Sequence, residues 1–178
     1  MFIYFFWLNC IISLNYLASL FAKHRAEIYI LHPYNALPDI LQEKLPCLPK
    51  YTPDYLLVLL SFIIYNFKID IKIQEVNALF RCLSLRPIFV CVTTFPTCMK
   101  KIKSPTQIIN KIFHSTHDLM FSGHTCVFIF FGRLIGGTSG DIVKYILPIT
   151  LVQAKQHYTI DVVVAMLVYN TVIHNSFM

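Results

Sequence analysis

A histidine and an aspartate lie four residues apart in HYTIDVVVAM, residues 157–166, a stretch that is otherwise almost wholly apolar. A spacing of four residues predicts that His157 and Asp161 share one face of a helix. The Asp161 carboxylate can then accept a hydrogen bond from one imidazole nitrogen and stabilise the charged ring. The other nitrogen remains to attack a substrate or to take a proton. The alternative interpretation is an ion pair that only stabilises a helix.

A second histidine, His124, lies in the stretch SGHT, residues 122–125. The step from Ser122 to Gly123 is typical of the beginning of a helix. The N–H groups and positive dipole end of a helix N-terminus suit a phosphate group. Ser122 and Gly123 are therefore predicted to bind phosphate oxygens beside His124. Taken alone, a histidine in an apolar segment is more often a hydrogen-bonded core residue.

Two arginines, Arg81 and Arg86, interrupt another apolar segment. A charge inside a bilayer costs a few kcal/mol, so an ionisable residue there suggests function. Arg86 offers a planar fork of donors that matches phosphate oxygens. Arg81 has a second explanation, because a long side chain can extend from a helix end to the membrane boundary or simply be packed there.

Together, the two histidines, the aspartate and Arg86 indicate phosphoryl transfer through a histidine. One histidine would attack phosphorus and the other would move protons, and the residues alone do not assign these two roles. No metal or cofactor is expected, because the six cysteines form no CxxC pair and the chemistry requires no metal.

The composition of the chain indicates what must position these residues. Of 178 residues, 56% are hydrophobic and 13% are charged, and the mean hydropathy is +0.60. The charged share is about half of that in an average soluble domain, which is too small to cover a globular surface. The alternative of a soluble domain with a large core is therefore disfavoured.

Apolar segments recur along the whole chain and predict helices that span a membrane. They cover 2–22, 55–67, about 76–98, 120–136, about 142–153 and about 158–174. The predicted fold class is an all-α integral membrane protein, with about six transmembrane helices in a single domain over 1–178. Between His124 and His157 there are too few residues for two full crossings and a turn, which need about 40. Either the fourth and fifth helices are therefore short or tilted, or the fifth, which contains Pro148, does not cross the membrane fully.

The net charge of +6 raises the question of an anionic partner. The chain has no basic run interleaved with aromatic residues, so no nucleic-acid partner is expected. The densest basic cluster, KKIK at 100–103, lies between apolar segments. It is interpreted as a loop beside the membrane.

Three stretches resemble signature blocks of the sphingomyelin synthase family, within the lipid phosphate phosphatase (PAP2) superfamily. They are DLMFSGHT at 118–125, HYTIDVVVA at 157–165 and RPIFVCVTTFP at 86–96. The stretch ALPDILQEKLP at 36–46 is weakly similar to the loop between the family's first two helices. The resemblance implies a PAP2-like helical bundle.

The resemblance also implies a role for each matched residue. His157 matches the nucleophile that takes the phosphorylated headgroup, and Asp161 matches the carboxylate that orients it. His124 matches the acid that protonates the departing diacylglycerol and then the base that activates the acceptor hydroxyl. Arg86 matches the phosphate-binding arginine. Phe121 and Leu151 replace a proline and an arginine of the phosphatases, which favours the synthase branch.

The function implied is transfer of a phospho-headgroup from a glycerophospholipid to ceramide or a related lipid alcohol. The nearest alternative is a lipid phosphate phosphatase or phospholipase-C-like hydrolase, and the second is a non-catalytic lipid-binding membrane protein. The implied location is a multi-pass membrane protein of the Golgi, the endoplasmic reticulum or the plasma membrane, if the source is eukaryotic. The oligomeric state is left open.

The side of the membrane on which the site lies receives two opposed predictions. A six-helix path puts both histidines on the side that carries nine Lys/Arg residues, against four on the other. The positive-inside rule therefore predicts a cytosolic site. The resemblance implies a lumenal or exoplasmic site, and this is the orientation that we expect.

Overall fold

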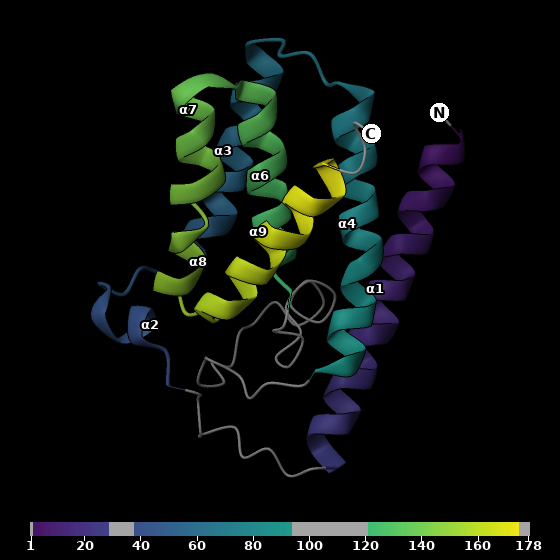
Figure 1. The fold of residues 1–178 in the computed structure, drawn as a ribbon, viewed down its shortest axis with the longest axis vertical. Helices are drawn as coiled ribbons and strands as arrows, with labels where there is room; N and C mark the ends of the chain where they lie inside the picture. Colours follow the sequence, from purple (N-terminus) through teal and green to yellow (C-terminus); the bar gives the residue numbers. More distant parts are fainter. Residues whose placement is uncertain (1, 29–37, 94–120, 175–178) are drawn as a thin grey trace.

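The computed structural model describes residues 2–28, 38–93 and 121–174, and within these ranges all regular structure is helical (Figure 1). The predicted all-α class is therefore confirmed. The helices are α1 (Phe2–Ile28), α2 (Ile40–Lys44), α3 (Thr52–Asn66), α4 (Ile73–Val92), α6 (Gly123–Ile135), α7 (Gly137–Asp141), the π-helix η1 (Ile142–Ile146), α8 (Ile149–Gln153) and α9 (Thr159–His174).

Each of the six predicted apolar segments contains helix. In the third apolar segment, the helix α4 ends at Val92. Residues 94–120 lie outside the described residues. They include the last three residues of the RPIFVCVTTFP block, 94–96, and the basic cluster at 100–103. The mixed stretch before the second apolar segment contains the short helix α2.

The fifth helical segment differs from the prediction, because it begins at Gly137 rather than near residue 142. It runs through α7, η1 and α8, with Pro148 between the last two. Gly136 has a φ of 70°, a left-handed conformation that glycine adopts without strain, so the chain reverses at once after α6. Only Gly136 separates α6 from α7. The fifth segment is therefore about one helical turn longer than the sequence pattern indicated.

The reversal brings α7 into close contact with α6. A Cβ atom added at Gly132 would lie 2.5 Å from the carbonyl oxygen of Gly140 and 2.9 Å from the backbone nitrogen of Lys144. Only a residue without a side chain fits there. The two glycines thus let the fifth segment pack along α6 and return to the end of the bundle where α6 begins.

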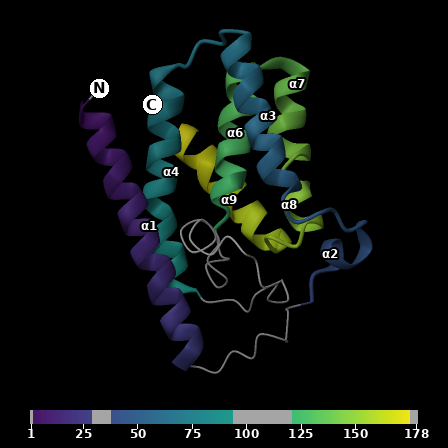
Figure 2. The same ribbon diagram turned by 180° about the vertical axis from the view of Figure 1, so that it is seen from behind.

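Helix α6 occupies the centre of the bundle and contacts α3, α4, α7, η1 and α9 (Figures 1 and 2). One core cluster lies between α4, α6 and α9 and includes Cys82, Ile129 and Tyr169. A second lies between α3, α6, α8 and α9 and includes Phe128 and Leu151. The starts of α6 and α9 are therefore held on both sides by packed helices.

Helix α1 packs along the outer side of α4, where its small residues Ala18 and Ala22 meet Val90 (Figure 2). Over Phe5–Arg25 it is long and apolar enough to cross a membrane, which no other helix in the described ranges matches. Three further helices, α3, α6 and α9, are apolar but shorter.

Candidate active site

His157 and Asp161 meet at the beginning of α9. Nδ1 of His157 lies 3.3 Å from Oδ2 of Asp161, and both side chains are buried. The predicted contact is present, but the predicted geometry is wrong, because His157 lies two residues before the helix rather than on its face. Asp161 is the third helical residue, and its side chain turns back to accept the backbone N–H of Tyr158 at 2.8 Å. An acidic side chain at this position commonly closes the start of a helix in this way.

His124 lies in the first turn of α6, which begins where the Ser-Gly step predicts. Ser122 is the N-cap, and its hydroxyl accepts the backbone N–H of Thr125 at 3.2 Å. The N–H of Ser122 in turn donates to the carbonyl oxygen of Asp161 at 3.4 Å. This bond joins the start of α6 directly to the first turn of α9.

The carboxylate of Asp54, which was not among the predicted site residues, faces His124. Oδ1 of Asp54 lies 3.2 Å from Nε2 of His124. Oδ2 of Asp54 accepts the side-chain amide of Gln156 at 2.9 Å, and the same amide donates to the carbonyl oxygen of Lys50 at 2.6 Å. Gln156, which precedes His157 in the chain, therefore orients the Asp54 carboxylate that contacts His124.

A local signal marks the position of Asp54. It lies in the first turn of α3, after Thr52 and Pro53. Proline at the first helical positions and an acid in the first turn are both typical of a helix start. The sequence Thr-Pro-Asp before an apolar run could have placed this carboxylate at the end of α3 that shares a side with His124.

The site therefore consists of two histidine–carboxylate pairs that face one another. The ring centroids of His124 and His157 lie 6.4 Å apart, with the planes inclined by 58°. The pairs come from the starts of α3, α6 and α9, which meet at one end of the bundle. The predicted placement of both histidines at one end is thus confirmed, and the two rings are near enough to contact one small group.

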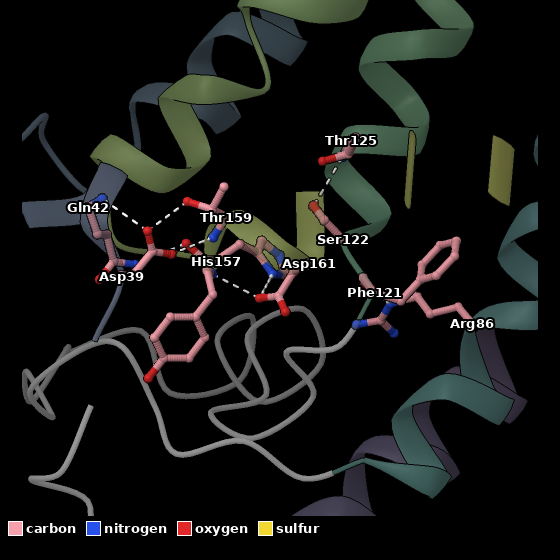
Figure 3. Close-up of polar contacts among 10 residues, drawn as sticks. Asp39, Gln42, Arg86, Phe121, Ser122, Thr125, His157, Thr159 and Asp161 are labelled. Carbon is pink, nitrogen blue, oxygen red and sulfur yellow. Dashed lines mark hydrogen bonds and ion pairs between the residues drawn. The ribbon is translucent and has the colours of Figure 1, made fainter. Parts of the chain in front are cut away.

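Arg86 lies beside the start of α6. Its Nε donates to the carbonyl oxygen of Phe121 at 3.1 Å, and Nη1 donates to Oδ1 of Asn15 at 2.9 Å. Arg86 therefore ties α4 to α1 and to Phe121, the residue before Ser122. Figure 3 shows Arg86 beside Phe121. Arg81 is exposed on α4. Arg86 is thus the arginine that adjoins the predicted phosphate-binding residues.

Two buried polar atoms beside the pairs have no hydrogen-bond partner within the described part of the chain. They are Oγ1 of Thr125, which follows His124, and Oε1 of Gln156, which precedes His157. Unsatisfied buried acceptors and hydroxyls are uncommon and call for a partner.

The short helix α2 also contacts the site. The side chain of Asp39 accepts two hydrogen bonds from Thr159, the first residue of α9, and the side chain of Gln42 donates to the carbonyl oxygen of His157 (Figure 3). Neither residue was predicted as part of the site. Among the described residues, no group of three or more His, Cys, Asp or Glu side chains is placed to hold a metal ion.

No family model matches this chain, and neither the curated proteins nor the solved structures provide a match.

Proposed function

We propose that the chain is a membrane phosphotransferase of the sphingomyelin synthase type. It would move a phospho-headgroup from a glycerophospholipid to ceramide or a related lipid alcohol. The observation that carries the proposal is the meeting of two histidine–carboxylate pairs with ring centroids 6.4 Å apart. One such pair is needed for a nucleophile and the other for proton transfer to and from two alcohols.

In the first step, His157 attacks the phosphorus atom of the donor lipid. Because Asp161 contacts Nδ1, this nitrogen carries the ring proton and Nε2 is the nucleophile. The P–O bond to diacylglycerol breaks as the N–P bond forms. His124, protonated at this stage, gives a proton to the departing oxygen, and Asp54 stabilises the charged ring before this transfer.

In the second step, the acceptor hydroxyl attacks the same phosphorus atom. His124, now neutral, takes the hydroxyl proton, the new O–P bond forms and the N–P bond to His157 breaks. Since Asp54 holds Nε2 of His124, Nδ1 is the nitrogen that exchanges protons with both alcohols. The enzyme returns to its starting protonation state, and the reaction needs no metal.

Ser122, Gly123 and Arg86 are proposed to bind the phosphate oxygens. Helix α6 has 13 residues, so its N-terminus presents backbone N–H groups with a positive dipole end. Gly123 lies next to the guanidinium group, since a Cβ atom there would be 3.7 Å from Nε of Arg86. Negative charge that develops on phosphorus oxygens would thus meet donors from two sides.

A bilayer is the proposed setting of the six apolar helical segments. Large apolar side chains remain exposed on the outer faces of α1 and α3, including Trp7 at 55%, Phe62 at 64% and Val58 at 68% exposure. Large exposed apolar patches on a protein surface are typical of contact with lipid or with another protein. We therefore propose an integral, multi-pass membrane protein, located in the Golgi, the endoplasmic reticulum or the plasma membrane if the source is eukaryotic.

The same intermediate could be resolved by water, which would make the protein a lipid hydrolase. One observation favours this second candidate: the side chains of His124 and Asp54 are 26% and 31% exposed. Water that reaches His124 would lose its proton to the same nitrogen as an acceptor hydroxyl. The two candidates share every residue of the first step and differ only in the group that enters in the second.

Purified protein in mixed micelles with headgroup-labelled phosphatidylcholine distinguishes the candidates. A labelled ceramide-based lipid that forms only when ceramide is present supports the transferase. Free phosphocholine at the same rate with and without ceramide supports the hydrolase. A His157→Ala variant, shown to be folded, should form neither product, and full activity of that variant would refute both.

A further inference from the structure

The short helix α2 lies outside the helical bundle, at the end where α9 begins (Figure 1). None of its five residues is buried, and Ile40 and Leu41 are exposed. Helix α2 is therefore not part of either core cluster. Its side-chain hydrogen bonds run instead to the residues that surround His157.

The carboxylate of Asp39 accepts backbone N–H groups at the starts of two helices, α2 and α9. As the N-cap of α2, its Oδ1 accepts the backbone N–H groups of Leu41 at 3.1 Å and Gln42 at 3.2 Å. The same carboxylate accepts the backbone N–H of Thr159 at 2.6 Å and the Thr159 hydroxyl at 2.7 Å. Thr159 is the first residue of α9, so Asp39 supplies one of the N-terminal N–H groups of α9 with the acceptor that the helix itself lacks.

Gln42 holds the backbone of the histidine itself. Its side-chain amide donates to the carbonyl oxygen of His157 at 3.0 Å, across 115 residues of sequence. Asp39 and Gln42 thus bind positions 159 and 157, on either side of Tyr158. The N–H of Tyr158 is the group that donates to Asp161. The contacts from α2 therefore flank the bond that orients the Asp161 carboxylate towards His157.

The turn from α8 to α9 needs contacts of this kind. Lys155, two residues before His157, has a φ of 54°, a left-handed conformation that a residue with a side chain adopts at a cost. The turn must therefore be held by groups outside it. Asp39 and Gln42 supply such groups from a segment more than 100 residues away.

The hydrogen bonds to Asp39 favour the charged form of its carboxylate. Partial burial favours the neutral acid, but the hydrogen bonds from Thr159, Gln42 and Leu41 outweigh it and lower the pKa of Asp39 below its usual value. Hydrogen bonds to a charged acceptor are stronger than those between neutral groups.

We propose that Asp39 and Gln42 are positioning residues for His157. They hold residues 157–159 so that the imidazole keeps its bond to Asp161 and its position beside His124. The proposal rests on the proposed function, because it assigns these contacts to the nucleophile of that reaction. Neither residue touches the reacting phosphorus, so their effect is on the rate of the chemical step rather than on binding of the donor lipid.

Four variants and a matched control test the proposal. Gln42→Glu keeps the size of the side chain but removes the donor to His157, and Asp39→Asn removes the charge. Thr159→Ala removes the hydroxyl that Asp39 accepts, whereas Thr159→Ser retains it. Glu43→Gln is the control, because Glu43 is an exposed acid of the same helix. Circular dichroism and size-exclusion chromatography in detergent show whether each variant is folded.

The first readout does not depend on enzymatic activity. The rate at which diethyl pyrocarbonate modifies His157, measured by mass spectrometry, is compared with the rate at exposed His174. Loss of one of these hydrogen bonds should raise the ratio of the two rates by about 3- to 10-fold in Gln42→Glu and Asp39→Asn. Thr159→Ser and Glu43→Gln should keep the ratio of the wild type. A variant that circular dichroism or size-exclusion chromatography shows to be unfolded is left out, and Thr159→Ala then replaces it in the comparison.

The second readout is headgroup transfer. Gln42→Glu and Asp39→Asn should lower kcat by about 10-fold or more with an unchanged KM for the donor lipid, because a small displacement of a nucleophile slows the chemical step strongly. An unchanged modification ratio together with an unchanged kcat in folded Asp39→Asn and Gln42→Glu would overturn the proposal. If the wild type transfers no headgroup, the proposed function has failed, and the modification ratio alone still decides whether α2 positions His157.

Discussion

The carboxylate of Asp54 lies 3.2 Å from Nε2 of His124, although 70 residues separate the two in the chain. Asp161 makes the corresponding contact with Nδ1 of His157 at 3.3 Å. Opposite ring nitrogens are thus engaged in the two histidines. If the proposed reaction is correct, the first ring works through Nδ1 and the second through Nε2.

The Asp54 contact gives the first prediction. Asp54→Asn keeps the size of the side chain but removes the charge that stabilises protonated His124, so kcat should fall by about 100-fold. Steady-state transfer assays with purified variants measure this. Asp70→Asn is the matched control, because Asp70 is an exposed acid in the link before α4. Equal kcat values for the Asp54 and Asp70 variants would exclude a role for Asp54 in proton transfer.

The second prediction concerns the close contact of α6 and α7. In Gly132→Ala, the new methyl group would meet backbone atoms of Gly140 and Lys144 at less than 3.0 Å, so the helices must separate. We expect the free energy of unfolding to fall by about 1–3 kcal/mol. Thermal unfolding in detergent measures the change. Ser139→Ala, at an exposed position next to Gly140, should leave the melting temperature unchanged, and an equal loss in both variants would contradict the packing described.

The third prediction concerns an ion pair at the other end of α6. Arg133 donates to Glu75 at 2.6 and 2.8 Å, and Glu75 is buried in the first turn of α4. Arg133→Met leaves a buried carboxylate without its partner and should lower the free energy of unfolding by about 3 kcal/mol. The double variant with Glu75→Leu should be more stable than Arg133→Met alone. A double variant that is less stable than both single variants would contradict this account of the pair.

The fourth prediction is a pH dependence that follows from the lowered pKa of Asp39. A carboxyl group with a lower pKa in the folded state stabilises that state above its unfolded pKa of 3.8, and the contribution is lost as the pH falls through the folded value. The wild type should therefore be more stable than Asp39→Asn by a constant amount from about pH 5 to 8. The difference should shrink below pH 3.8. Thermal unfolding of both proteins across this range measures it, and a difference that grows on acidification would contradict the assignment.

The sequence predicted the helices because a long apolar segment in a membrane must satisfy its own backbone hydrogen bonds, and a helix does so. It also predicted the start of α6, because the Ser122–Gly123 step and the following apolar run are local signals. The extra turn of the fifth segment was missed, since it depends on the conformation of Gly136 and on the fit of Gly132 against Gly140. These features appear only when two helices are packed together.

In the candidate site, too, the sequence predicted the local contact and missed the long-range ones. His157 and Asp161 are close in sequence, so their contact was expected even though the helix begins after His157. Asp54 and Asp39 reach their partners across 70 and 120 residues. The Thr-Pro-Asp pattern could place Asp54 at a helix start, but the partner that each acid reaches depends on how the helices dock.

The most direct test of the central claim is a search for the covalent intermediate on His157. Purified protein is mixed with phosphatidylcholine without ceramide, quenched in alkali, in which a phosphorus–nitrogen bond to histidine survives, and analysed by peptide mass spectrometry. The account predicts a phosphocholine adduct on the peptide that contains His157, which decreases when ceramide is added and is absent from His157→Ala. Product formation with no adduct on His157, or with the adduct on another residue, would contradict it.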